Sequence, residues 1–311
     1  MEEAAQVEQA QWNETTWGKY FHKDFIRRPG AHLLGISKTN TGKTMRAIIL
    51  AGHCIKEGKK NIAWFDSSKS DEVLYLLTVA QKTGAPVRIL YPGALGCSVK
   101  VEGSPVPIEY ISIERPGEMF RLMGPGINIA SIRPFFTELT PYVKYLSRAM
   151  NGLINDAYRR KINLRPLQIF MDEFQTICPA KRIHETSRQQ ELGARIAMAI
   201  YTLRSEGIGL AAFSQSYRNI APSVRPQFDY YMAGRAPDGD PRDYIGKILF
   251  DYTHLLAKLK PSQCIIIFPN GMFPREIISF PLPAKPPGAT VTYEGYQISS
   301  RVRDDSDDER T

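Results

Sequence analysis

The feature that most constrains this chain is a short polar run between an apolar segment and an amphipathic one. The run comprises Ser37, Lys38, Thr39, Asn40, Thr41, Gly42, Lys43, Thr44 and Met45. It matches the phosphate-loop pattern G-x-x-x-x-G-K-[ST], with serine at the first glycine position. Residues 32–36 before it are typical of a buried strand, and residues 45–55 after it of a helix. A strand that turns into a helix N-terminus directs backbone N–H groups and the helix dipole at one anion.

The run therefore predicts a loop that binds the phosphates of ATP. In such a loop Lys43 reaches the β- and γ-phosphates, and the Thr44 hydroxyl is a ligand of Mg²⁺. The serine at position 37 removes nothing essential from the pattern. The alternative interpretation is a Gly-Lys-Thr turn that precedes a helix by chance.

A second motif follows another apolar run, at residues 167–171. This run ends in the acidic pair Asp172 and Glu173. Such a pair at the end of a buried strand suits a Mg²⁺-dependent nucleotide hydrolase: Asp172 holds the metal through water, and Glu173 polarises the attacking water. Solvated carboxylates at a strand end are the plainer alternative. Together, the two motifs predict an ATPase that hydrolyses ATP to ADP and phosphate.

The composition fits one large intracellular α/β domain. The chain has 311 residues, 43% of them hydrophobic, and no apolar run near the roughly 18–20 residues that span a membrane. The acidic N-terminus is not a signal peptide. Four scattered cysteines without a C-x-x-C pair are typical of reduced thiols.

The charge pattern is consistent with a polyanionic partner. The net charge is +8 and the pI about 9.2, although residues 301–311 carry five acids against three arginines. A basic body suits nucleic acid, while a solvated basic surface is the alternative. The cluster Arg159-Arg160-Lys161, expected at a helix C-terminus, either complements the helix dipole or contacts DNA.

Strand-like and helix-like segments alternate from residue 31 onward, which predicts a mostly parallel sheet flanked by helices. We expect an N-terminal arm over residues 1–30, which packs on the core or a neighbouring subunit or supplies an aromatic ring to adenine. An ATPase domain over 31–283 follows, with a loop and small hairpin inserted at 92–126. Residues 284–311 are expected to form a flexible acidic tail. Helices are predicted at 71–83, 140–161, 185–203 and 241–256.

The order of these motifs resembles that of FtsK–HerA ATPases across residues 31–283. The resemblance rests on the phosphate loop, the acidic pair and a strand at 209–213 that leads to Ser214 and Gln215. It also includes the stretch 204–209 before that strand and a Lys-Leu-Lys-Pro-x-x-Cys turn at 258–264. The resemblance implies a RecA-like (ASCE) P-loop NTPase fold, within a superfamily of DNA-pumping motors.

The resemblance also implies roles for further residues. Gln215 corresponds to the polar sensor of the γ-phosphate or the attacking water. Arg204 stands where an arginine reaches the neighbouring subunit's site, and Arg235 is the second candidate for this role. An arginine supplied in trans implies a homo-oligomeric ring, expected to be a hexamer. Each of these side chains has a plainer alternative role in hydrogen bonding within its own chain.

We expect DNA contacts from Lys181, Arg182 and Arg188, directly after the acidic pair, or else a solvated basic loop there. Without a transmembrane segment or a further domain in the sequence, the chain most resembles a viral genome-packaging ATPase. It would move double-stranded DNA into a capsid and dock on a capsid vertex or a membrane protein. It would work in the host cytoplasm, also in association with the virion. The alternatives are a plasmid-transfer or chromosome-processing translocase and, in another class, a protein secretion or assembly ATPase.

Overall fold

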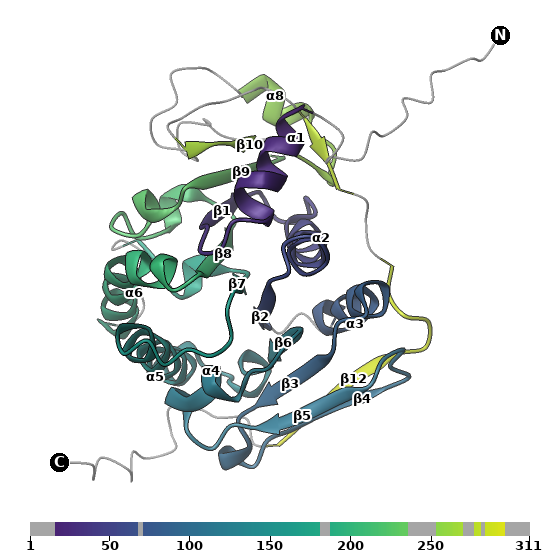
Figure 1. Ribbon diagram of the computed structural model, residues 1–311, viewed down its shortest axis with the longest axis vertical. Coiled ribbons are helices and arrows are strands. Elements are labelled where there is room, and N and C mark those ends of the chain that lie inside the picture. The colour runs from purple at the N-terminus through teal and green to yellow at the C-terminus, as the bar shows by residue number, and fades with distance from the viewer. Residues whose placement is uncertain are drawn as a thin grey trace.

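A ten-stranded sheet forms the centre of the molecule (Figure 1). The computed structural model describes residues 16–67, 71–180, 187–235, 253–269, 277–280 and 284–295. The strand order is β11-β10-β9-β1-β8-β7-β2-β6-β3-β5. All pairings are parallel except the two that β10 makes with its neighbours. The predicted α/β fold with a mostly parallel sheet is therefore confirmed.

The central strands are short apolar runs that are buried on both faces, as expected for parallel strands covered by helices. Every residue of β1, β7 and β8 is buried. The strands of the sheet are β1 (Leu33–Ile36), β2 (Asn61–Phe65), β3 (Val87–Tyr91), β5 (Ile108–Ser112), β6 (Ile127–Ala130), β7 (Leu167–Met171), β8 (Ile208–Ser214), β9 (Tyr230–Gly234), β10 (Gln263–Ile267) and β11 (Ile278–Ser279).

Helices cover both faces of the sheet because each has one apolar stripe to bury. Helices α2 and α3 pack together on one face, and α5 and α6 pack together on the other (Figure 1). The helices are α1 (Thr16–Phe21), α2 (Lys43–Lys56), α3 (Asp71–Thr83), α4 (Met119–Leu122), α5 (Leu139–Tyr158), α6 (Ser187–Ser205) and α8 (Thr253–Lys258). None of the helices in the described ranges is both long and apolar enough to cross a membrane.

The topology gives the sheet two functionally different edges. We call the edge at which the parallel strands end the carboxyl edge, and the opposite one, at which they begin, the amino edge. Strand β1 lies between β8 and β9, and β7 lies on the other side of β8. The segments that follow β1, β7, β8 and β9 therefore meet at the carboxyl edge.

The structure corrects the prediction for the insertion at 92–126. Its two strands, β4 (Ser98–Glu102) and β5, do not form a hairpin with each other. Strand β5 extends the main sheet by pairing parallel with β3, whereas β4 pairs antiparallel with β12 (Thr290–Glu294). The alternating pattern correctly indicated strands, but both partners are distant in sequence.

The prediction of a flexible tail from residue 284 is wrong for its first part. Residues 284–295 are described, and β12 forms a two-stranded sheet with β4. The Tyr293 hydroxyl donates a hydrogen bond to the buried Asp66 carboxylate (2.7 Å), and its ring lies edge-on to Phe135. These contacts, made between residues far apart in the chain, hold the segment. Residues 296–311 lie outside the described ranges.

The N-terminal arm packs on the core. After α1, a π-helical turn spans His22–Ile26. Phe21 and Phe25 are fully buried, and their rings meet Tyr230 at 5.8 and 5.5 Å between centroids. These two rings are therefore part of the core, whereas stacking of a Trp or Tyr ring of the arm on adenine stays a prediction. Residues 1–15 lie outside the described ranges.

Two helix predictions differ from the structure in detail. Helix α5 ends at Tyr158, three residues earlier than expected, and the Tyr158 side chain is 62% exposed. The predicted helix at 241–256 falls mainly on residues outside the described ranges, and α8 covers its end.

Candidate nucleotide site at the carboxyl edge

The phosphate-loop sequence leaves β1 at the carboxyl edge and is anchored there by its neighbours on both sides. The Ser37 N–H donates to the carbonyl of Ser214 at the end of β8 (3.1 Å), and the Lys38 N–H donates to the carbonyl of Arg235 after β9 (3.3 Å). The loop then leads directly into α2, which begins at Lys43. A helix N-terminus in this position favours an anion through its dipole and its backbone N–H groups.

The backbone of this loop requires the glycine of the motif. Gly42 has φ +78°, and a Cβ atom there would lie 2.5 Å from the Pro261 carbonyl oxygen. Asn40 also has a positive φ, +59°, which asparagine tolerates better than most residues. The turn at 258–264, noted in the sequence for its order only, thus packs directly against the loop.

Arg46 braces the loop, a role that the sequence analysis missed. Its guanidinium is 2% exposed and donates to the Thr41 carbonyl (2.8 Å), the Pro261 carbonyl (2.7 Å) and the Ser37 hydroxyl (2.6 Å). Burial lowers the pKa of Arg46 from its ordinary value. The bond to Ser37 gives the serine at the first glycine position a structural use. Nothing in the sequence distinguishes Arg46 from an arginine on the surface of a helix.

The acidic pair lies opposite the loop, at the end of β7. Asp172 is buried and forms an ion pair with the Lys43 ammonium, which also lies 3.2 Å from Glu173 Oε1. The Thr44 hydroxyl donates to Asp172 Oδ2 at 2.5 Å. The two motifs, about 130 residues apart in the chain, therefore meet in one site.

Glu173 is held by polar side chains and by an unusual backbone conformation. Its φ is +49°, in the left-handed region that a non-glycine residue rarely adopts. Gln215, which follows β8, donates to Glu173 Oε2 at 3.1 Å, and Gln175 donates to the same oxygen. Gln215 reaches Glu173 because β8 lies between β1 and β7 in the sheet.

The donor set at this edge fits Mg²⁺. Thr44 Oγ1 and the Asp172 carboxylate are hard oxygen ligands, and they lie within hydrogen-bond distance of each other. Mg²⁺ in phosphate-binding sites takes one or two such protein oxygens and completes its shell with water and phosphate oxygens. The residues present are therefore compatible with a nucleotide-bound magnesium ion.

The two candidate arginines lie at opposite edges of the sheet. Arg204, at the end of α6, precedes β8 at the amino edge, where its guanidinium Nη2 contacts both carboxylate oxygens of Asp229 at 2.8 Å. Arg235 follows β9 at the carboxyl edge, where its carbonyl accepts a hydrogen bond from the loop. Within a single chain, only Arg235 of these two adjoins the phosphate loop.

The predicted DNA contacts cannot be located. Lys181 and Arg182 lie outside the described residues, and Arg188 lies in α6 with a side chain that is also outside the description. These three positions remain predictions.

Comparison of the sequence with known protein families and with curated proteins gives no match. Among solved structures, VirB4 of Thermoanaerobacter pseudethanolicus has a TM-score of 0.53 and 12% identity, over 82% of this chain and 90% of that one. At this identity the likeness shows a shared fold, and it agrees with the predicted P-loop ATPase architecture.

Two further similar structures are of B204. One is B204 from Sulfolobus turreted icosahedral virus, a DNA-packaging ATPase (TM-score 0.48, 15% identity, 82% of this chain and 99% of that one). The other is the genome-packaging NTPase B204 of Sulfolobus turreted icosahedral virus 2 with ATP-gammaS (0.45, 11%, 81% and 98%). Both TM-scores are below 0.5, so the fold assignment rests on the VirB4 comparison and on the topology.

Proposed function

We propose that this protein is a Mg²⁺-dependent ATPase that moves double-stranded DNA through a ring and packages a viral genome into a capsid. The observation that supports the ATPase is the convergence of five side chains at the carboxyl edge: Lys43, Thr44, Asp172, Glu173 and Gln215. They come from three separate strand ends, and each matches a role that ATP hydrolysis requires.

In this proposal the loop N–H groups and Lys43 bind the β- and γ-phosphates. Glu173 accepts a proton from the attacking water, and Gln215 orients the Glu173 carboxylate through the 3.1 Å hydrogen bond. Thr44 and Asp172 hold Mg²⁺, which neutralises charge on the phosphate oxygens when it is bound. The left-handed backbone at Glu173 fixes the direction of its carboxylate relative to the loop.

We further propose a homohexameric ring in which an arginine acts on the phosphates across a subunit boundary. The contact with Asp229 favours a structural role for Arg204 and makes Arg235 the stronger candidate for this arginine. Sedimentation velocity with an ATP analogue is expected to give about six times the 35.1 kDa mass of one chain. A monomer at micromolar concentration under these conditions would contradict the ring.

The DNA-packaging part rests on the basic net charge of +8 and on the order of motifs, which resembles that of DNA-pumping ATPases. A capsid-vertex or membrane protein would be the docking partner, in the host cytoplasm and in the virion. Plasmid transfer or chromosome processing would use the same motor with another partner protein.

The test is steady-state ATP hydrolysis with and without linear double-stranded DNA, at 50 and 200 mM salt, with Lys43→Ala as the blank. We expect DNA to raise the rate several-fold and salt to weaken this effect, because phosphate contacts release counterions. Hydrolysis that ignores DNA at low salt would leave the ATPase intact and point to a protein substrate. Equal rates for Lys43→Ala and the unchanged protein would overturn the ATPase itself.

A further inference from the structure

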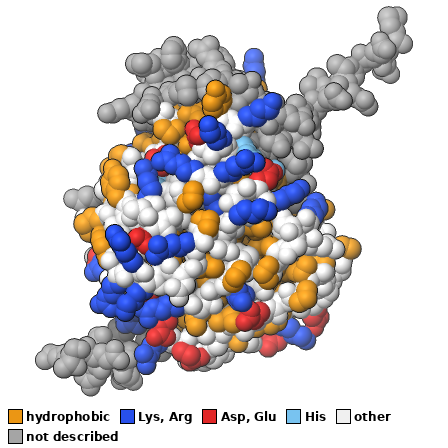
Figure 2. Space-filling view, viewed as in Figure 1, with side chains coloured by type: hydrophobic (Ala, Val, Ile, Leu, Met, Phe, Trp, Pro, Cys, Tyr) orange, Lys and Arg blue, Asp and Glu red, His pale blue; other side chains and the backbone are white. Residues whose placement is uncertain are grey.

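The amino edge carries a second concentration of charge, which the nucleotide site does not use. Helices α2, α3, α5 and α6 end there, and basic residues stand at these helix ends and in the segments that lead into β1, β2, β3 and β7. We name the exposed cations among them the basic face: Arg27, Arg28, Lys56, Lys59, Lys82, Arg159, Arg160 and Lys161. Figure 2 shows Lys and Arg side chains spread over one face of the molecule, with fewer Asp and Glu.

Within the described part of the chain, no residue of the basic face has an ion-pair partner. Three acids at the same edge are already paired with other cations, and Glu57 contacts His22 and His53. Asp156 binds Arg121 at 2.5 Å, and Asp229 binds Arg204 at 2.8 Å. Glu206 forms an ion pair with Arg165, which is not part of the basic face. The positive charge of the basic face is therefore not cancelled locally.

Helix dipoles account for only part of this charge. Each helix C-terminus is equivalent to roughly half a negative charge. The four helices α2, α3, α5 and α6 that end at this edge thus bring on the order of two negative charges. Eight exposed cations exceed that number by a wide margin. Complementation of the helix ends, one interpretation of the Arg159–Lys161 cluster, is insufficient to explain the whole face.

The cations are spread across the sheet instead of being gathered in one pocket. Arg28 precedes β1, Lys59 precedes β2 and Lys82 leads towards β3. In the strand order β1-β8-β7-β2-β6-β3, β1 and β3 are five positions apart and β2 lies between them. At a strand spacing of about 4.8 Å the face is about 24 Å wide. This width matches on the order of seven base pairs of a duplex at about 3.4 Å each.

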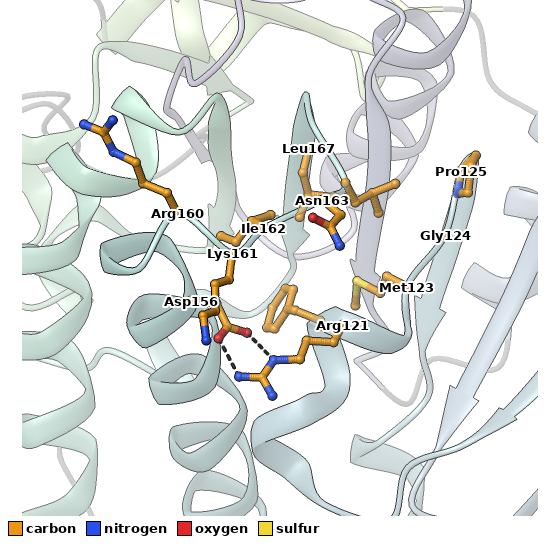
Figure 3. Close-up of a pocket in the computed structure, with 12 residues that line it drawn as sticks. Arg121, Met123, Gly124, Pro125, Asp156, Arg160, Lys161, Ile162, Asn163 and Leu167 are labelled. Carbon is orange, nitrogen blue, oxygen red and sulfur yellow. Dashed lines mark hydrogen bonds and ion pairs between the residues drawn. The ribbon is translucent and has the colours of Figure 1, made fainter.

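A hollow of about 800 Å³ lies within this edge, between the segment after α4 and the segment after α5 (Figure 3). The Arg121–Asp156 ion pair lies in its wall, and Arg160 and Lys161 are among its lining residues. In Figure 3 the Arg160 side chain extends away from the ion pair. The hollow is far from the phosphate loop, which lies at the other edge, and it gives the basic face a concave part.

We propose that the basic face binds the sugar-phosphate backbone of double-stranded DNA, as a contact separate from the nucleotide site. A duplex fits because it presents regularly spaced phosphates and needs no apolar anchor. Membrane and protein partners are normally held by large apolar or aromatic side chains. Among the described residues near the helix ends at this edge, the exposed ones of that kind are Tyr20, Leu122, Tyr158 and Tyr201, each on a different helix. This inference rests on the proposed function for its choice of partner.

The experiment compares binding of a fluorescein-labelled 30-base-pair duplex by anisotropy from 50 to 200 mM salt, without nucleotide. The test variant combines Arg159→Gln, Arg160→Asn and Lys161→Gln, with asparagine at 160 because φ there is +53°. A second variant combines Lys56→Gln, Lys59→Asn and Lys82→Gln, with asparagine at 59 because φ there is +52°. The matched control removes three exposed cations elsewhere, through Lys100→Gln, Arg115→Gln and Arg148→Gln.

We expect each test variant to bind the duplex at least tenfold more weakly at 100 mM salt. The slope of log affinity against log salt should fall by about 0.9 for each lost phosphate contact, while the control changes less than twofold. If the unchanged protein binds the duplex and both test variants match it, this inference is wrong and the DNA motor stands. If the unchanged protein binds no duplex at 50 mM salt, both fail. Stronger binding to phosphatidylserine vesicles or to polyglutamate than to the duplex would assign the basic face to another partner.

Discussion

The charged side chains of the nucleotide site at the carboxyl edge are buried or half-buried and paired, whereas at the amino edge many cations are exposed and unpaired within the described residues. Lys43, Asp172 and Arg46 make buried polar contacts that join the segments after β1 and β7 to the segment before β10. Arg159, Arg160 and Lys161 instead extend into solvent. Buried charges act only in a fixed geometry, which suits chemistry, whereas exposed charges act at a distance and tolerate movement of a partner.

The largest expected effect comes from removing the base at the carboxyl edge. Glu173→Gln should lower the rate of ATP hydrolysis at least 100-fold, because an amide cannot accept the proton of the attacking water. ATP binding, measured by titration calorimetry, should persist because Lys43 and the loop are unchanged. Glu191→Gln, which changes an exposed carboxylate on α6, is the control and should retain full activity. Full activity of Glu173→Gln would contradict the proposal that Glu173 accepts the proton of the attacking water at the carboxyl edge.

The next largest effect should be a loss of stability when the buried guanidinium of Arg46 is removed. Arg46→Ala leaves the Thr41 and Pro261 carbonyls without their donor and is expected to lower the free energy of unfolding by about 3 kcal/mol. Urea denaturation measures this loss. Arg148→Ala, at an exposed arginine of α5, should stay within about 0.5 kcal/mol of the unchanged protein. A loss at Arg46 no larger than this control would show that the network does not stabilise the loop.

A pH-dependent loss of stability is expected from His32, which is buried at the amino edge beneath the basic face. Burial, and next the charge of Arg204, lowers the pKa of His32 to about 3. Because the unfolded chain takes up the proton near pH 6.5, stability is complete above that pH and falls as the pH drops towards 3. The loss between pH 7 and pH 5 should be about 2 kcal/mol.

The matched variant for this test is His32→Asn, whose side-chain oxygen can replace Nδ1 as the acceptor of the Leu210 N–H. It should remove most of the difference between urea denaturation curves at pH 7 and pH 5. If the variant keeps the full pH dependence, other groups are responsible, such as His53, whose pKa is lowered by burial.

The smallest expected effect is the change in the free energy of unfolding when cations of the basic face are removed. The combination of Lys59→Asn and Lys82→Gln should change the free energy of unfolding by less than about 0.5 kcal/mol, because both side chains are exposed and unpaired in the described structure. Thermal unfolding followed by circular dichroism measures it. A loss above 1 kcal/mol would show that these charges serve the fold, and the contrast between the two edges would disappear.

Local patterns in the sequence were sufficient for the fold class and for the loop and acidic-pair residues that meet in the site. Apolar runs that end in polar motifs, such as residues 167–171 before Asp172, indicate parallel strands whose ends carry function. The phosphate loop requires a glycine at one turn and a lysine at the start of a helix. Nine consecutive residues, 37–45, contain both, so the motif can be recognised in the sequence alone. The hydrogen bond between Gln215 and Glu173 follows from strand order, which a single sequence does not reveal.

Other features depended on contacts between distant residues, and only the tertiary structure decided them. Residues 290–294 do not show in the sequence which strand is their partner, and the structure shows that β4 pairs with them and that Asp66 accepts a hydrogen bond from Tyr293. In the sequence Arg46 cannot be told from an exposed helical arginine, and only the structure shows that it donates hydrogen bonds to Ser37 and Pro261. The basic face is scattered over 135 residues of sequence and becomes continuous because the topology brings successive helix ends to one edge. Motifs are local and can be found in a sequence, whereas burial and shared surfaces are properties of the folded chain.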